Sequence, residues 1–272
     1  MQRYTVMKKW IALVLCFATL LASVALLSGC GSKEKTPDTI KKAGELVIAT
    51  SPDFPPFESL DGNGNVVGIE IDILNIVCEK LGVTLKISQI DFDSVLPGVQ
   101  ADKYDLGASG ITVNEKRKKN VLFTDAYCLA AQAIVANEGS SIQSKADLAG
   151  KSVAVQTGTT AESYCMENGY DVKSFTANND AQSALQSGKV DAWVIDDLTA
   201  ADMVKVNNAG DGTKLVILDE VMTTEPYAFA LSFGSEELVA EINSILADLQ
   251  SQGKIKEIFE KYDAPFTAPD QK

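Results

Sequence analysis

Apolar and polar positions along this chain alternate between two spacings, and the alternation predicts strands that are followed by helices. The runs Glu45–Thr50, Val83–Ile87 and Ser152–Gln156 are short and rich in β-branched residues, which is typical of strands. From Glu70 to Leu81 the apolar residues recur at helical spacing, and Gly82 ends that helix. Because strands and helices alternate, the pattern predicts a mostly parallel sheet flanked by helices.

A second series of the same kind begins near Ile134. It predicts a helix from about Ala161 and a later strand at Val190–Ile195. Two such series within 272 residues suit two domains of about a hundred residues each. The last expected helix is Ile255–Tyr262, and the residues from Ala264 onward are expected to be loose.

The N-terminus has the pattern of an export signal. An uncharged stretch runs from Trp10 to Gly29, and the basic residues before it are Arg3, Lys8 and Lys9. This stretch is nearly long enough to span a bilayer, so a plain transmembrane anchor is one interpretation. The small residues directly before Cys30 resemble instead a lipobox, at which the signal is cut and the cysteine is diacylated.

The lipobox interpretation makes the protein extracytoplasmic. It predicts a lipoprotein signal peptide over residues 1–29, lipidation at Cys30 and a flexible polar tether over residues 30–39. The lipid would hold the protein at the outer face of the cell membrane. Met7 is an alternative start, because the two lysines that follow it already form a basic region.

Composition and charge exclude several classes of function. A net charge of −13 argues against nucleic acid as a partner. The absence of histidine excludes Ser-His-Asp and Cys-His catalysis and any His-ligated metal site, although carboxylate and lysine chemistry remain possible. No cysteine pair has CxxC spacing, so no zinc or redox motif, metal or cofactor is expected. Cys78 is expected to be a buried small hydrophobe, and whether Cys128 pairs with Cys165 stays open.

The stretch from Ser109 to Tyr127 is the strongest candidate for a binding site. Gly110 has no Cβ and lets a ligand approach the backbone, and Thr112 offers a hydroxyl. Asn114 suits a helix N-cap, and Thr112 with Glu115 fits a capping box. Arg117 would then lie one turn into a short helix, where its guanidinium can grip a carboxylate with two hydrogen bonds. The alternative is a surface helix with solvated lysine and arginine side chains.

This stretch, Ser-Gly-Ile-Thr-Val-Asn-Glu-Lys-Arg followed by Lys-Lys-Asn-Val-Leu-Phe-Thr-Asp-Ala-Tyr, resembles the signature of family 3 extracellular solute-binding proteins. These are the amino-acid receptors of ABC importers. The resemblance covers about residues 40–263 and implies an α/β fold of the two-lobed periplasmic-binding-protein type (type II). Two mostly parallel sheets flanked by helices would be joined by two hinge strands. Lobe 1 would hold residues 40–131 and 225–268, and lobe 2 residues 132–224.

The resemblance also implies the roles of individual residues. Gly110, Thr112 and Arg117 would hold the α-carboxylate of the ligand. The turn 157–160 before a helix would complete that clamp, because free amides at a helix N-terminus bind anions. Asp196, at the end of a strand, would receive the α-ammonium. The complete set of expected ligand-binding residues is Ser51, Phe54, Glu70, Phe92, Ser109, Gly110, Thr112, Arg117, Gln156, Thr157, Thr159, Thr160 and Asp196.

The side-chain end of the pocket is expected to comprise Ser51, Phe54, Glu70 and Phe92. Two aromatic rings would sandwich the ligand side chain, and Glu70 would repel an acidic one. No arginine or lysine in these segments could neutralise an acidic ligand. Cationic and polar neutral ligands are therefore expected about equally. Glu70 could instead turn away and cap its own helix.

The expected function is that of a monomeric receptor that binds a free amino acid between its lobes and delivers it to an ABC permease in the membrane. Two alternatives remain open. One is an enzyme on the same scaffold, similar to cyclohexadienyl dehydratases, with Glu70 as its acid. The other is a ligand-sensing module without a transporter.

Overall fold

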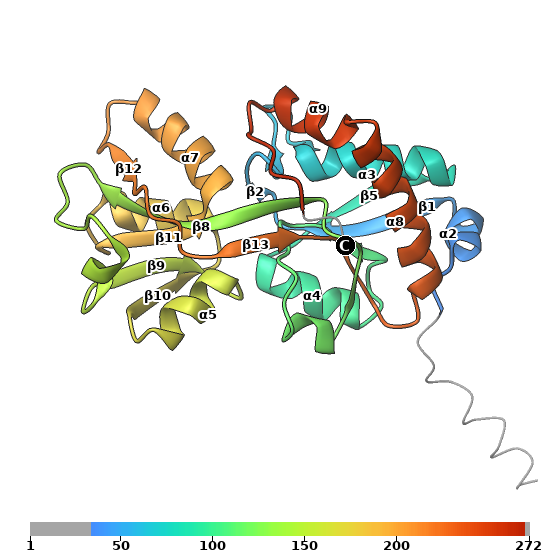
Figure 1. The fold of residues 1–272 in the computed structure, drawn as a ribbon, viewed down its shortest axis with the longest axis horizontal. Coiled ribbons are helices and arrows are strands. Elements are labelled where there is room, and N and C mark those ends of the chain that lie inside the picture. Colours follow the sequence, from blue (N-terminus) through green and yellow to red (C-terminus); the bar gives the residue numbers. More distant parts are fainter. Residues whose placement is uncertain (1–33, 270–272) are drawn as a thin grey trace, which may run out of the picture. The chain divides into compact units, whose positions relative to one another are not determined.

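The computed structural model describes residues 34–269, and these form two α/β lobes. The sheet of lobe 1 has the strand order β5-β1-β6-β14-β7, and the sheet of lobe 2 has the order β10-β9-β11-β8-β12 (Figure 1). This confirms the expected α/β fold with two lobes. Within residues 34–269 no helix combines the length and the apolar character that crossing a membrane requires.

Lobe 1 begins and ends the described chain. Its first part contains α2 (Pro37–Ala43), β1 (Glu45–Thr50), β2 (Asp53–Phe54), β3 (Glu58–Leu60), β4 (Val66–Val67), α3 (Ile69–Leu81), β5 (Thr84–Gln89), α4 (Phe92–Gln100), β6 (Leu106–Gly107), the 3₁₀ turn η1 (Arg117–Lys119) and β7 (Leu122–Phe123). Its last part contains β14 (Ala230–Leu231), α8 (Glu236–Ser251) and α9 (Lys254–Lys261). In Figure 1, α3 and α9 lie above the sheet, α4 lies below it, and α8 runs down past the sheet on the right.

Lobe 2 is a continuous stretch of the chain that begins with β8 and ends with β13. Its elements are β8 (Cys128–Asn137), η2 (Lys145–Leu148), β9 (Ser152–Gln156), α5 (Thr160–Glu167), β10 (Asp171–Phe175), α6 (Asn178–Gln186), β11 (Ala192–Asp196), α7 (Asp197–Ala209), β12 (Leu215–Ile217) and β13 (Thr224–Tyr227). The helix α7 follows β11 directly, and Asp196 is its N-cap residue.

Both sheets are mixed, yet most strands of each sheet run in the same direction, as expected. In lobe 1, β1 runs parallel to β5 and β6, whereas β14 is antiparallel to β6 and β7. In lobe 2, β9 is parallel to β10 and β11, whereas β8 is antiparallel to β11 and β12. The physical reason is that β8 and β14 lie where the chain passes between the lobes, so they run against strands made by βαβ crossovers.

Two strands connect the lobes. β8 and β13 pair in antiparallel register, from Ala131 opposite Thr224 to Cys128 opposite Tyr227 (Figure 1). Both strands continue into lobe 2, where β8 joins the sheet. They are the two hinge strands that the fold class requires.

The folded unit starts earlier than the expected tether of residues 30–39 allows. Lys35 is buried, and its ammonium donates to the carbonyl of Tyr104 and lies 3.4 Å from Asp105. Thr36 caps α2 by accepting from the amide of Thr39 at 3.2 Å. Residues 37–39 therefore belong to a helix. Residues 1–33, with the expected signal peptide and Cys30, lie outside the described residues.

The C-terminal tail is also better ordered than expected. Leu129 donates its amide to the carbonyl of Thr267 at 2.9 Å. The ring of Phe266 packs edge-on against Phe259 with 5.0 Å between centroids. The expectation of a loose chain from Ala264 is therefore wrong for these residues, because an aromatic anchor holds them on lobe 1.

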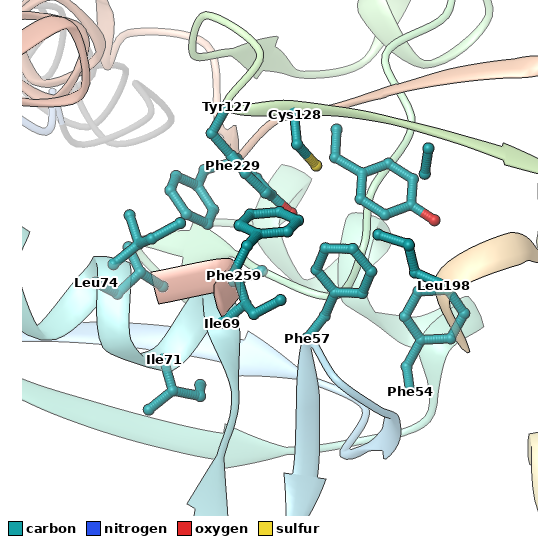
Figure 2. Close-up of a cluster of buried hydrophobic side chains, with 14 of the residues drawn as sticks. Phe54, Phe57, Ile69, Ile71, Leu74, Tyr127, Cys128, Leu198, Phe229 and Phe259 are labelled. Carbon is teal, nitrogen blue, oxygen red and sulfur yellow. The ribbon is translucent and has the colours of Figure 1, made fainter. Parts of the chain in front are cut away.

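An aromatic cluster joins the core of lobe 1 to the base of the hinge. Phe57 stacks with Phe54 at 5.8 Å, and Tyr127 stacks with Phe229 at 5.1 Å between ring centroids (Figure 2). Tyr227, on β13, meets Phe57 edge-on at 5.1 Å. Large buried rings contribute strongly to core stability. The cluster thus fixes the loop that carries Phe54 relative to both hinge strands.

Candidate functional site

A small cavity of about 20 Å³ lies between the two lobes. Its walls come from both: Phe54, Phe92, Ser109, Gly110, Thr112 and Arg117 from lobe 1, and Gln156, Thr159, Thr160, Ala161, Asn178, Val194, Ile195 and Asp196 from lobe 2. A larger cavity of about 240 Å³ shares Phe92, Arg117, Thr159 and Thr160 with it. Most residues expected to bind the ligand therefore meet at one place.

Arg117 links the lobes. Its guanidinium donates to the carbonyl of Thr112 at 2.9 Å and, across the cleft, to the carbonyl of Gly158 at 3.2 Å. It also lies over the ring of Phe92 at 5.7 Å. Burial lowers the pKa of Arg117, while the nearby carboxyls of Glu225 and Asp196 oppose this change. The guanidinium has five N–H donors, so it retains donors for a carboxylate.

The local structure around Arg117 differs from the expected short α-helix. Arg117 opens a 3₁₀ turn, and its amide donates to Oδ1 of Asn114 at 2.9 Å. Glu115 pairs with Lys118 at 2.8 Å instead of closing a capping box with Thr112. The guanidinium captures the carbonyl of Thr112, and this contact holds the chain in a tighter turn.

The N-terminus of α5 forms the opposite wall. Thr159 caps the helix by accepting from the amide of Glu162 at 3.0 Å. The hydroxyl of Thr160 accepts from Gln132 at 2.9 Å and donates to Glu225 at 3.1 Å. The positive end of the helix dipole therefore faces the cavity.

Thr157, which was expected in the clamp, does not line the cavity. Both its amide and its hydroxyl donate to the carbonyl of Phe175, at 2.8 and 3.1 Å. The residue thus joins the ends of two neighbouring strands, and its hydroxyl is already used.

Asp196 lies at the other end of the cavity with little exposure. The hydroxyl of Tyr227, from the second hinge strand, donates to its carboxylate. Burial, together with the nearby Glu225, raises the pKa of Asp196 to about 8, although the hydrogen bond from Tyr227 acts to lower it. Asp197 points elsewhere, since it accepts from the amide of Ala131 at 3.2 Å. A cation at Asp196 would stabilise the ionised carboxylate.

Gly110 is required by the ring of Phe54. Its φ is +54°, and a Cβ built there would lie 2.5 Å from that ring. Phe54 in turn packs between Phe57 and Tyr227. Only glycine lets the backbone of this loop lie so close to an aromatic ring in this conformation.

Glu70 is not a wall of the cavity, which corrects its expected place at the side-chain end. It is fully buried beneath the loop, where it accepts from the amide of Gly110 at 3.2 Å and from the hydroxyl of Tyr127 at 2.5 Å. It therefore does not cap its own helix either. The carboxyl of Glu58 lies beside it and accepts from the hydroxyl of Ser109 at 3.0 Å.

Burial explains the protonation of this carboxyl pair. It raises the pKa of Glu70 to about 7 and the pKa of Glu58 well above its usual range, and the charge of Glu70 adds to the effect on Glu58. Two buried carboxyls that lie side by side cannot both be ionised without strong repulsion. The pair supports the loop at Ser109 and Gly110 from below. The enzyme alternative requires an acid beside the substrate, and Glu70 does not lie in the cavity where a substrate would bind.

Ser51 also lies outside the cavity walls. Its amide donates to the hydroxyl of Ser109 at 3.1 Å, and its own hydroxyl donates to Asp53 at 3.0 Å. Asp53 is a residue that the sequence did not single out. It bridges to lobe 2, where Asn178 donates its amide at 2.7 Å and Gln156 donates Nε2 at 3.1 Å.

Asn178 and Glu225 are further residues that sequence reasoning missed. Asn178 opens α6 and lines the cavity, and Glu225 lies on the hinge strand β13 and contacts Thr160. Only the position of Asn178 at a helix start gave a signal. Hinge pairing and lobe contact are long-range features that no local pattern encodes.

No metal or disulfide chemistry is built into the part of the chain that the structure describes. No group of Cys, Asp and Glu within residues 34–269 has the arrangement of a metal site. Cys78, Cys128 and Cys165 are buried and unbonded, so Cys128 and Cys165 do not pair. Burial raises the pKa of Cys165 to about 12, as expected for an inert thiol.

Comparison with known proteins agrees with this geometry. Residues 46–265 match the family described as "Bacterial extracellular solute-binding proteins, family 3". The chain belongs to this family. The arginine-binding extracellular protein ArtP of Bacillus subtilis is 31% identical over 94% of this chain and 98% of its own length. This relative is named as a binding protein, and the family match makes the chain a solute-binding protein.

Two solved structures extend the likeness to the fold. A mutant of ArgBP from T. maritima is 39% identical, covers 84% of this chain and 98% of its own, and superposes with a TM-score of 0.79. An ancestral arginine-binding protein bound to glutamine is 40% identical, covers 82% and 99%, and has a TM-score of 0.76. The two-lobed architecture of the family member is thereby confirmed.

Proposed function

We propose that this protein is the extracytoplasmic receptor of an ABC importer and that it binds a free amino acid with a cationic or polar neutral side chain. One observation carries the proposal: a guanidinium, that of Arg117, and a carboxyl, that of Asp196, line one cavity between the lobes. A zwitterion offers a partner to each, and unpaired buried charges are costly.

The α-carboxylate of the ligand would bind Arg117, the hydroxyl of Thr112 and the amides at the start of α5. The α-ammonium would bind Asp196. The closed cavity holds about 20 Å³, roughly the space of one water, so the lobes must part to admit a ligand. Ligand contacts to both lobes would then favour closure, and a permease would recognise the closed form.

The side chain of the ligand would lie between the rings of Phe54 and Phe92. Aromatic faces bind aliphatic carbons and stack on cations. Relatives named for arginine, and the ancestral arginine-binding protein bound to glutamine, support both ligand classes that we propose.

Calorimetry with arginine, lysine, glutamine and glutamate tests the proposal. We expect the wild type to bind a cationic or neutral ligand and to bind glutamate most weakly. Arg117→Ala should abolish binding of every ligand, because a buried pair is worth roughly 3–5 kcal/mol when one partner is removed. Lys119→Ala, in the same turn but exposed, is the matched control and should bind like the wild type.

Two results would contradict the proposal. If glutamate bound more tightly than the other three amino acids, the proposed ligand class would be wrong. Micromolar binding retained by Arg117→Ala would mean that the guanidinium does not hold the ligand carboxylate.

A further inference from the structure

Asp53 fastens the two lobes together. It lies on β2 of lobe 1, and its carboxylate accepts from two groups of lobe 2: the backbone amide of Asn178 at 2.7 Å and Nε2 of Gln156 at 3.1 Å. Ser51 completes the set from lobe 1 at 3.0 Å. All three partners are donors, so the carboxylate is arranged to remain an acceptor.

This carboxylate fixes the orientation of the amide of Gln156, which lines the cavity. Nε2 of Gln156 donates to Asp53 and, at 3.1 Å, to the carbonyl of Thr176, and neither of these groups can donate in return. Oε1 therefore turns the other way and accepts from Nδ2 of Asn178 at 3.0 Å. Both hydrogens of Gln156 are used, so this side chain can offer a ligand only an acceptor.

The charge of Asp53 has no cationic partner among the described residues. None of the ion pairs within residues 34–269 includes it. Its neighbour Phe54 and its partners Gln156 and Asn178 are walls of the cavity. A cationic group of a ligand beside Gln156 would therefore meet an acceptor and, behind it, an uncompensated negative charge.

We infer that Asp53 is a specificity-determining residue, which clamps the closed lobes and makes the receptor prefer amino acids with a cationic side chain over neutral ones. This inference rests on the proposed amino-acid receptor function. It selects one of the two ligand classes that the cavity residues alone allow. Asp53 acts through Gln156 and through its charge, without lining the cavity itself.

Calorimetry of Asp53→Asn with arginine and glutamine tests the inference. The variant keeps the size of the side chain and removes the charge. We expect arginine affinity to fall roughly tenfold or more, as for loss of a charged hydrogen-bonding group, and glutamine affinity to fall about threefold or less. Asp53→Ser should give the same change in the ratio, which guards against a folding defect in one variant. Asp125→Asn, which removes an exposed carboxylate from lobe 1, should leave both affinities within about twofold.

The ratio of the two affinities separates specificity from a structural role, since general damage would weaken both ligands alike. Both variants should still fold without ligand and melt in a single cooperative transition. An equal loss of affinity for both ligands, or no loss, would overturn the inference. The proposed receptor function would still hold in that case, because the wild type binds its ligand. A wild type that binds none of the amino acids tested would overturn both.

Discussion

Arg117 and Asp196 are the two ionisable walls of the cavity that face the expected ligand, and burial shifts both toward the neutral form. It lowers the pKa of Arg117 and raises the pKa of Asp196 to about 8. Their hydrogen bonds to Gly158 and from Tyr227 offset part of this cost. A zwitterionic ligand would supply each residue with the opposite charge. The site is thus prepared for a ligand that carries both charges.

The raised pKa of Asp196 predicts that affinity depends on pH. Below about 8 the free protein holds a proton on this carboxyl, and that proton must leave before the ligand ammonium can pair with it. Affinity should therefore rise with pH, by up to about tenfold per unit, and level off above about pH 8. Calorimetry in two buffers of different ionisation heat should detect proton release on binding below this value.

Asp196→Asn is the control for this dependence. Its affinity should be lower and should lose the slope, because an amide does not titrate. A wild-type affinity that stays constant between about pH 6 and pH 8 would contradict the assigned pairing.

At the scale of elements, the loop at Ser109 and Gly110 is held from two sides. The ring of Phe54 packs above it, and the buried pair Glu58 and Glu70 accepts its donors from below. α3 contributes Glu70 and β3 contributes Glu58, so two separate elements meet under one loop. The raised pKa values of the two carboxyls favour their neutral forms, which can stay buried without a cation.

The carboxyl pair predicts a pH-dependent stability. The pKa of Glu70 is about 7 in the folded protein, against an ordinary value of 4.5. Between these two pH values the native state therefore holds a proton that the unfolded state has released. The contribution is fully present below pH 4.5 and is lost as pH rises through about 7. The wild-type free energy of unfolding should fall across this range by on the order of 2 kcal/mol.

Denaturant titrations of Glu70→Gln across this range measure the effect. The amide cannot ionise, so the fall should be smaller in the variant by the contribution of Glu70, while the contributions of Glu58 and Asp196, whose pKa values are also raised, remain. Glu79→Gln changes an exposed carboxylate in the same helix and should keep the wild-type profile. If the stability of Glu70→Gln depended on pH in the same way as that of the wild type, the raised pKa of Glu70 would be contradicted.

At the scale of the whole molecule, two hinge strands and a few polar contacts govern the cleft. Tyr227 on β13 reaches Asp196, and Glu225 on the same strand reaches Thr160 at the start of α5. Asp53 and Arg117 add direct bonds between the lobes. Closure of the lobes would therefore change the contacts of the ligand and of the hinge strands at the same time.

We expect the mature protein to be tethered by a lipid at Cys30, a residue outside those the structure describes. Cys30→Ser should release the protein from membranes while leaving ligand affinity unchanged, because only the acyl anchor is lost. Fractionation of cells followed by calorimetry on the released protein checks both points. Continued membrane association of the variant would point to an uncleaved transmembrane segment.

The sequence by itself determined the features that depend on local pattern. Hydrophobic spacing located β1, α3 and β9, because side-chain period follows directly from backbone geometry. The family signature identified the loop around Arg117 and the start of α5. These residues do meet at the cavity, because the loop that follows β6 in lobe 1 faces the turn between β9 and α5 in lobe 2.

Only the tertiary structure decided what is buried and what crosses the cleft. Glu70 lies in a clear helix, yet its side chain turns beneath the binding loop because Glu58, Ser109 and Tyr127 surround it there. Nothing in the local sequence distinguishes Asp53 from other acids. Its role depends on Asn178, which lies 125 residues further along the chain and donates to it from lobe 2. Such contacts depend on how distant segments pack, and a helical or strand period carries no information about them.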